Sequence, residues 1–123
     1  MADGDMTLAR REHDRVIELE ICGEVDIYSA KSLGRELENL ACKKKHILLD
    51  LFQTYYIDSI GLSLFIAFHK KQWEKGKILG LCSPGDNMKR ILNLTGLYGF
   101  LTIFENKGDA LCALSEGRTV NFD

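Results

Sequence analysis

The sequence predicts a single α/β domain with a mixed, mostly parallel central sheet and about four helices. Short apolar runs of strand length alternate along the chain with segments whose apolar residues recur at helical spacing. Such alternation is typical of largely parallel sheets with helices packed on them. A length of 123 residues suits one domain, which we expect to span 1–123 with its core at about 6–116.

The N-terminal part is expected to form a hairpin. Residues 7–11 and 15–22 have the composition of strands, and apolar residues alternate with acidic ones in the second strand. This alternation predicts that its apolar face packs inward and that Glu18 and Glu20 face solvent.

The rest of the chain continues as helix, strand, helix, strand, helix, strand and helix. The first of these helices carries a clear apolar stripe, and Gly76 and Gly96 are expected to end the next two. The expected elements are helices over 29–41 and 59–75, strands over 46–51, 77–82 and 101–104, a helix with Ser83 as N-cap and Pro84 as first residue, a turn over 106–108, a helix around 110–114, and a loop over 52–57.

Composition and charge narrow the function classes. A net charge of −2 provides no strong field to attract nucleic acid or acidic lipid, and Lys43–Lys45 is interpreted as a solvated helix end. The N-terminus, Met1–Asp5, has no apolar signal-peptide run, and the longest apolar stretch, 60–68, is too short to cross a bilayer. We therefore expect a cytoplasmic protein.

No catalytic, metal or cofactor site is expected. The cysteines and histidines are scattered without ligand spacing, and His69 lies roughly 15 Å along the expected helix from Ser59, too far to activate it. Asp26, Asp50 and Asp58 could meet at one sheet edge as a metal or phosphate site, although such residues are more often turn and cap formers. The protein is therefore not expected to be an enzyme.

The most informative stretch of the chain is Ile57–Leu62. It marks the change from a strand to a helix and places Ser59 where the helix dipole is positive and backbone N–H groups are free. Ser59 is expected to cap the helix, and the same N–H groups would tolerate a phosphate. The apolar start of this helix also suggests a contact surface near Ile60, Leu62 and Phe65, although core packing is the more frequent role for such residues.

These motifs, in their order and spacing, make the chain similar to STAS domains, in the free-standing bacterial form called an anti-sigma factor antagonist. The similarity covers roughly residues 15–114. Its elements are Gly23–Asp26 with Ala30 and Leu33, Leu48–Leu51, Ile57–Leu62, Gly76 with the strand 78–81, Ser83, and Leu94–Leu97.

The resemblance implies a STAS-like fold and a binding role. Such a protein binds an anti-sigma factor that is also a serine kinase, and thereby releases a sigma factor. The resemblance makes Ser59 the phosphorylated residue, whose modification breaks the complex and whose free form a PP2C-type phosphatase restores. The partner contact is expected at Asp26, Asp58, Ser59, Ile60, Gly61 and Leu62.

Two departures from the family pattern leave other functions open. The family motif usually reads Asp-Ser-Ser-Gly or Asp-Ser/Thr-x-Gly, whereas here the third position is Ile60, and Tyr55-Tyr56 replaces the smaller apolar residues common before the motif. The alternative is a STAS module whose serine is not phosphorylated, acting as a stressosome-type scaffold or as the cytoplasmic subunit of a lipid transporter. A small hydrolase or nucleotide-binding protein is the least favoured, and the oligomeric state is left open.

Overall fold

The sheet is built around strand β2 (Val16–Val25), which is 10 residues long. In the computed structural model, which describes residues 6–116, β2 pairs antiparallel with β1 (Thr7–Glu12) and parallel with β3 (His46–Asp50). Beyond β3 come β5 (Leu79–Cys82) and β6 (Thr102–Phe104), both parallel, which gives the order β1-β2-β3-β5-β6. The expected mixed, mostly parallel sheet is thus confirmed.

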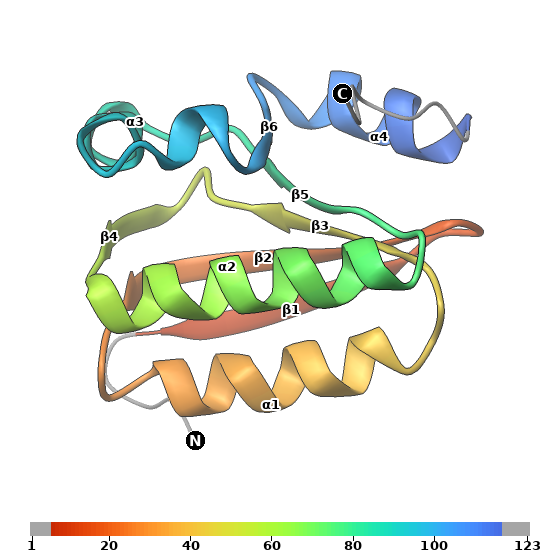
Figure 1. Cartoon of the computed structure of the whole chain (residues 1–123), viewed down its shortest axis with the longest axis horizontal. Helices are drawn as coiled ribbons and strands as arrows, with labels where there is room; N and C mark the ends of the chain where they lie inside the picture. The colour runs from red at the N-terminus through yellow and green to blue at the C-terminus, as the bar shows by residue number, and fades with distance from the viewer. Residues whose placement is uncertain (1–5, 117–123) are drawn as a thin grey trace.

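Helices cover both faces of this sheet (Figure 1). α1 (Ala30–Ala41) and α2 (Ser59–Glu74) lie side by side on one face, and α4 (Lys107–Ser115) packs on the other. α3 (Asp86–Leu94) and the short 3₁₀ turn η1 (Leu97–Gly99) follow β5 and contact each other. No helix within residues 6–116 is both long and apolar enough to cross a membrane.

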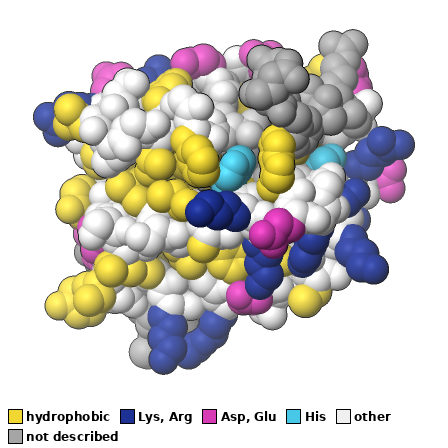
Figure 2. Space-filling model, in the orientation of Figure 1, with side chains coloured by type: hydrophobic (Ala, Val, Ile, Leu, Met, Phe, Trp, Pro, Cys, Tyr) yellow, Lys and Arg dark blue, Asp and Glu magenta, His cyan; other side chains and the backbone are white. Residues whose placement is uncertain are grey.

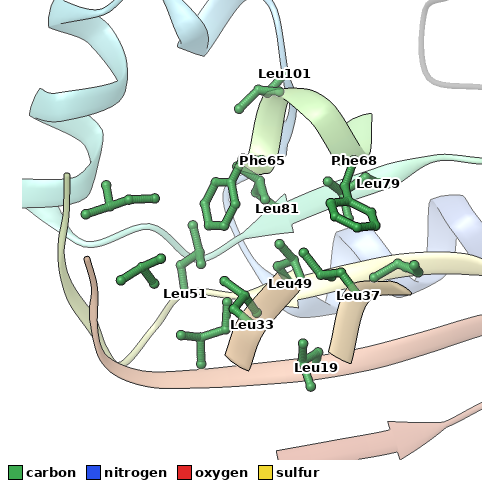
Figure 3. Packing of buried hydrophobic residues seen from close by; sticks show 14 of the residues in the cluster. Leu19, Leu33, Leu37, Leu49, Leu51, Phe65, Phe68, Leu79, Leu81 and Leu101 are labelled. Atoms are coloured by element: carbon green, nitrogen blue, oxygen red, sulfur yellow. The ribbon is translucent and has the colours of Figure 1, made fainter. Parts of the chain in front are cut away.

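The two faces of the sheet have separate apolar cores. The larger core joins the sheet to α1, α2 and α3, and Figure 3 shows Phe65 and Phe68 of α2 reaching down toward the leucines of the strands and of α1. The smaller core lies under α4 and contains Val16, Leu48 and Leu114. Leu62 and Phe65 are buried, so they belong to the core and only Ile60 of the three suggested contact residues is exposed.

A strand that the sequence assigned to a loop lies just before the motif. β4 (Thr54–Ile57) pairs in parallel with the last residues of β2, after a register shift at Gly23. It forms because β2 extends beyond β3, so its C-terminal residues need another partner for their backbone hydrogen bonds. Tyr55 and Tyr56 are both exposed, so the strand lacks the alternation that would have identified it.

Two helix starts differ from the expectation. α3 begins at Asp86 with Gly85 as its N-cap, because the Ser83 N–H donates to Phe104 O at the end of the sheet and leaves Ser83 at φ 56°. α4 begins at Lys107, since Asn106 accepts the Asp109 N–H and acts as a cap rather than as part of a turn. The stops at Gly76 and Gly96 are confirmed by their positive φ angles of 72° and 75°.

The expectation that Glu18 of β2 faces solvent is wrong. Glu18 is buried under α4, where its carboxylate accepts hydrogen bonds from Lys107 Nζ at 2.8 Å and contacts His13 Nε2 at 2.9 Å. The polar–apolar alternation was correct, but a helix from the end of the chain covers the polar face. The expectation for the N-terminus, Met1–Asp5, concerns residues outside the described range.

Candidate functional site

Asp58 fixes the beginning of α2. It is the N-cap of this helix, and its Oδ1 accepts hydrogen bonds from the N–H groups of Ile60 and Gly61, both at 3.0 Å. Its Oδ2 accepts the Ile27 N–H from the β2–α1 connection at 3.1 Å. One carboxylate therefore ties the start of α2 to a segment about thirty residues earlier in the chain.

Ser59 is the first residue inside α2, so the expectation that its hydroxyl caps the helix is wrong. Ser59 is exposed, and its Oγ has no hydrogen-bond partner within residues 6–116. The nearby Ser63 Oγ donates instead to the Ser59 carbonyl oxygen at 2.8 Å. The Ser59 hydroxyl is thus held at a rigid helix start and is itself free to react or to contact a partner.

The N–H groups expected to be available for a phosphate are largely occupied. Of the first helical residues, Ile60 and Gly61 donate to Asp58 Oδ1, and Leu62 donates to the Asp58 carbonyl oxygen. The positive end of the helix dipole is therefore already partly satisfied by a carboxylate. A phosphate on Ser59 would have to compete with Asp58 for these donors or remain in solvent.

Gly61 is needed for close packing at this helix start. A Cβ on Gly61 would lie 2.6 Å from Ile57 Cγ1 and 2.7 Å from Val25 Cγ1, both far inside normal contact distance. Gly61 and Leu62 are buried, so their side of α2 faces the sheet and not a partner. Their part in the site is to hold Asp58, Ser59 and Ile60 in place.

Asp26 organises the neighbouring connection in the same way. Its Oδ1 accepts the N–H groups of Tyr28 and Ser29 at 2.9 and 3.1 Å, and Ser29 Oγ donates to Glu24 O at 2.8 Å. These bonds leave the side chains of Ile27 and Tyr28 in solvent. Asp26 and Asp58 are therefore turn and cap formers, the more frequent role expected for such residues.

An exposed apolar patch adjoins Ser59. It consists of Ile27, Tyr28 and Ile60, which are 63%, 76% and 47% exposed, and the Asp58–Ile27 hydrogen bond holds its two segments together. Figure 2 shows hydrophobic side chains gathered at the end of the molecule where α2 begins, on the left of the view. Ile27 and Tyr28 were not expected at the site, although two large apolar residues between the turn formers Asp26 and Ser29 are a usable signal in the sequence.

Asp50 lies away from this site. Its carboxylate is buried under α4, where Oδ2 is 3.4 Å from Lys107 Nζ. Lys107 also pairs with Glu18; burial opposes ionisation of the Glu18 carboxyl, but hydrogen bonds from Lys107 and His13 outweigh it and lower the Glu18 pKa. Within residues 6–116 no group of three His, Cys, Asp or Glu side chains is placed to hold a metal ion.

The histidines are also engaged elsewhere. His46 Nδ1 accepts the Ile78 N–H at 3.0 Å, and burial lowers the His46 pKa. His69 packs against Trp73 and Phe100, with ring centroids 5.9 and 5.1 Å away. Neither ring is placed to act as a base for Ser59, as a serine nucleophile would require.

Comparison with known proteins bears on the family and the fold of the chain. A model of the STAS domain matches residues 7–110. A curated relative, the anti-sigma-B factor antagonist of Bacillus subtilis (strain 168), is 30% identical over 93 residues, which cover 76% of this chain and 85% of the relative.

Solved structures show the same fold. An anti-sigma factor antagonist from Mycobacterium paratuberculosis superposes with a TM-score of 0.82 at 24% identity, covering 94% of this chain and 99% of that one. The Bacillus cell fate determinant SpoIIAA in its phosphorylated form superposes with a TM-score of 0.66 at 14% identity, covering 86% of this chain and 97% of that one. At these identities the structural likeness concerns the fold alone.

Proposed function

Because this chain belongs to the STAS domain family, we propose that it is an anti-sigma factor antagonist switched by phosphorylation at Ser59. In its unmodified form it binds an anti-sigma factor with serine kinase activity and so releases a sigma factor. A PP2C-type phosphatase restores the binding form. Since these partners belong to the transcription machinery of bacteria, the binding and its regulation take place in the cytoplasm.

The position of the Ser59 hydroxyl is the main support for this proposal. The Ser59 hydroxyl is exposed, has no hydrogen-bond partner within the described residues, and stands beside the apolar patch of Ile27, Tyr28 and Ile60. A protein partner seated on that patch would bury the hydroxyl at the same time. The modified atom and the contact surface would thus coincide.

Phosphorylation would act on the interface through charge. A phosphoserine carries about −1.5 to −2 charges at neutral pH. Asp58 already occupies the N–H groups of Ile60 and Gly61, so the helix start can neutralise little of this charge. A partner surface fitted to apolar side chains and a hydroxyl would then meet desolvation and repulsion costs of several kcal/mol.

The remaining expected partner-binding residues would support this surface. Asp26 and Asp58 hold the two loops, and Gly61 and Leu62 hold α2 against the sheet. Ile60 contributes directly because it is exposed. Its apolar side chain extends the patch, which favours a role in partner choice for this departure from the family pattern.

A phosphorylation assay tests the acceptor. The protein is incubated with ATP and the anti-sigma factor kinase from the same organism, and the modified residue is located by mass spectrometry. Ser59→Ala should abolish the modification. Ser63→Ala is the matched control, because Ser63 is an exposed serine one turn further along α2, and it should be modified like the wild type. Labelling of Ser59→Ala at the wild-type level would exclude Ser59 as the acceptor.

A binding assay tests the surface. Ser59→Glu and Tyr28→Ala should each weaken the complex with the anti-sigma factor by at least about tenfold, which corresponds to about 1.4 kcal/mol. Trp73→Ala is the control, since Trp73 is an exposed aromatic residue about 21 Å along α2 from Ser59. Circular dichroism should be unchanged in all three. An equal loss of affinity for Trp73→Ala would place the contact elsewhere.

A further inference from the structure

A second site lies at the end of the molecule opposite Ser59. A cavity of about 410 Å³ opens where α1 and α2 finish, lined by Ala41, Cys42, Lys44, Lys75 and Lys77. Three different segments contribute its lysines: the α1–β3 connection, the C-cap of α2 and the α2–β5 connection. Figure 2 shows several Lys and Arg side chains at this end, on the right of the view. The size is within the range of small-molecule sites.

The lysines of the cavity differ from their neighbours in having no carboxylate partner. Lys43 and Lys45 pair with Glu12, and Lys71 pairs with Glu38 at 2.9 Å. Within residues 6–116, none of the three cavity lysines has a carboxylate within ion-pair distance. The positive charge of these lysines is thus not compensated by a carboxylate of the described residues.

Lys44 has a conformation that lysine rarely adopts. Its φ is 59°, in the left-handed region where glycine or asparagine is normally found. A glycine would fit this turn without strain. The strained position is occupied by a residue whose side chain lines the cavity.

The positive charge at this end of the molecule acts on the half-buried His46. Burial lowers the pKa of His46, and the positive charges of Lys77 and Arg15 lower it further. The free carbonyl groups at the C-terminal ends of α1 and α2 carry partial negative charge, which opposes the positive charge of the lysines. Lys75 Nζ donates to one of these carbonyl groups, Ala41 O, at 3.2 Å. Lys44 and Lys77 have no such bond in the described structure, so they remain free for an anion.

We propose that this cavity binds a small soluble ligand carrying two or more phosphate groups. Three lysines from separate segments line this cavity without a carboxylate partner, and such a lining suits a compact, multiply charged anion better than a single carboxylate. The site is separate from the proposed partner surface, because about 22 Å of helix α2 lies between them.

Calorimetric titration of the whole chain with tripolyphosphate tests the proposal. The wild type should bind one equivalent, more weakly as salt is raised, and Lys77→Gln should weaken binding by at least about tenfold. Lys31→Gln is the matched control, because it removes the same charge from the exposed first turn of α1, far from the cavity. Absence of saturable binding, or an equal loss in Lys31→Gln, would overturn the proposal.

Lys44→Gly separates the ligand role from the structural one. It should raise Tm by removing the left-handed lysine, and it should nevertheless weaken tripolyphosphate binding. Wild-type affinity in this variant would exclude Lys44 from the site. Sedimentation with vesicles containing phosphatidylinositol phosphates distinguishes the source of phosphate: binding to these vesicles without binding to tripolyphosphate would overturn the soluble ligand in favour of a lipid headgroup.

Discussion

Replacing Asp58 by alanine should destabilise the protein far more than replacing Ser59 by alanine, although the two residues are adjacent at the start of α2. Asp58 accepts three backbone hydrogen bonds, two within α2 and one from Ile27. Ser59 Oγ accepts none from the described residues. The two substitutions therefore separate the cap of the helix from the proposed switch.

The magnitudes follow from these contacts. Loss of an N-cap side chain costs about 1 kcal/mol, and loss of the bond to Ile27 adds about 0.5–1 kcal/mol because the site is half-exposed. The free energy of unfolding should thus fall by about 1.5–2 kcal/mol in Asp58→Ala. In Ser59→Ala it should change by less than about 0.5 kcal/mol, since alanine is the better helix former and no bond is lost.

Asp58→Asn tests the separate contribution of Oδ2. Asparagine is as good an N-cap as aspartate, so the bonds to Ile60 and Gly61 can persist. The amide of asparagine presents an acceptor on one side only, so the Ile27 N–H would lose its partner. The cost should be about 0.5–1 kcal/mol, between those of the two alanine variants.

Equilibrium unfolding in urea, followed by circular dichroism, measures these differences. The midpoint should shift in the order wild type and Ser59→Ala, then Asp58→Asn, then Asp58→Ala, at an unchanged m-value. A loss of 1 kcal/mol or more in Ser59→Ala would show that the serine hydroxyl caps the helix after all. A loss below about 0.5 kcal/mol in Asp58→Ala would refute the role assigned to the carboxylate.

Three further predictions concern the supporting structure. Lys107→Met leaves buried Glu18 without its cation and should lower the free energy of unfolding by about 1–3 kcal/mol. This range is below that of a fully buried pair because the Lys107 side chain is 39% exposed. Adding Glu18→Gln should recover part of the loss, as measured by urea unfolding. Gly61→Ala should cost about 1–3 kcal/mol by overpacking against Val25, and an unchanged Tm would contradict the close approach. The His46 pKa is lowered on folding, so unfolding takes up a proton and the free energy of unfolding falls as the pH drops below 6.5. His46→Asn should flatten this part of the curve of Tm against pH. An unaltered curve would show that other groups cause the pH dependence.

Much of the fold could be predicted because its signals are local. The apolar stripe of α1 and the glycine stops at Gly76 and Gly96 depend on side chains within one or two turns. β4 could not be predicted, because its existence depends on β2 extending past β3. The burial of Glu18 depends likewise on α4, whose Lys107 is 89 residues away in the chain.

The candidate site could likewise be predicted from the sequence only in part. The sequence indicated Ser59, its position at a helix start, and the turn-forming roles of Asp26 and Asp58. It could not determine which of Asp58 and Ser59 caps α2, because both residue types are preferred there and only the backbone path decides which carboxylate or hydroxyl reaches the free N–H groups. The exposure of Ile60 and burial of Leu62 follow equally from the side of α2 that meets the sheet.

The sequence by itself determined the order of strands and helices except β4, the family, and the position of one serine at a strand-to-helix junction, because these follow from local patterning and from motifs at fixed spacing. Only the tertiary structure decided that Asp58 occupies the N–H groups, that Ile27 and Tyr28 stand beside Ser59, and that Lys44, Lys75 and Lys77 line one cavity. The Ile27–Asp58 bond, the apolar patch and the cavity each join segments about thirty residues apart, which only the packing of helices on the sheet brings together. The cap of α2 is local, but Asp and Ser are both preferred caps, so only the backbone path selects Asp58.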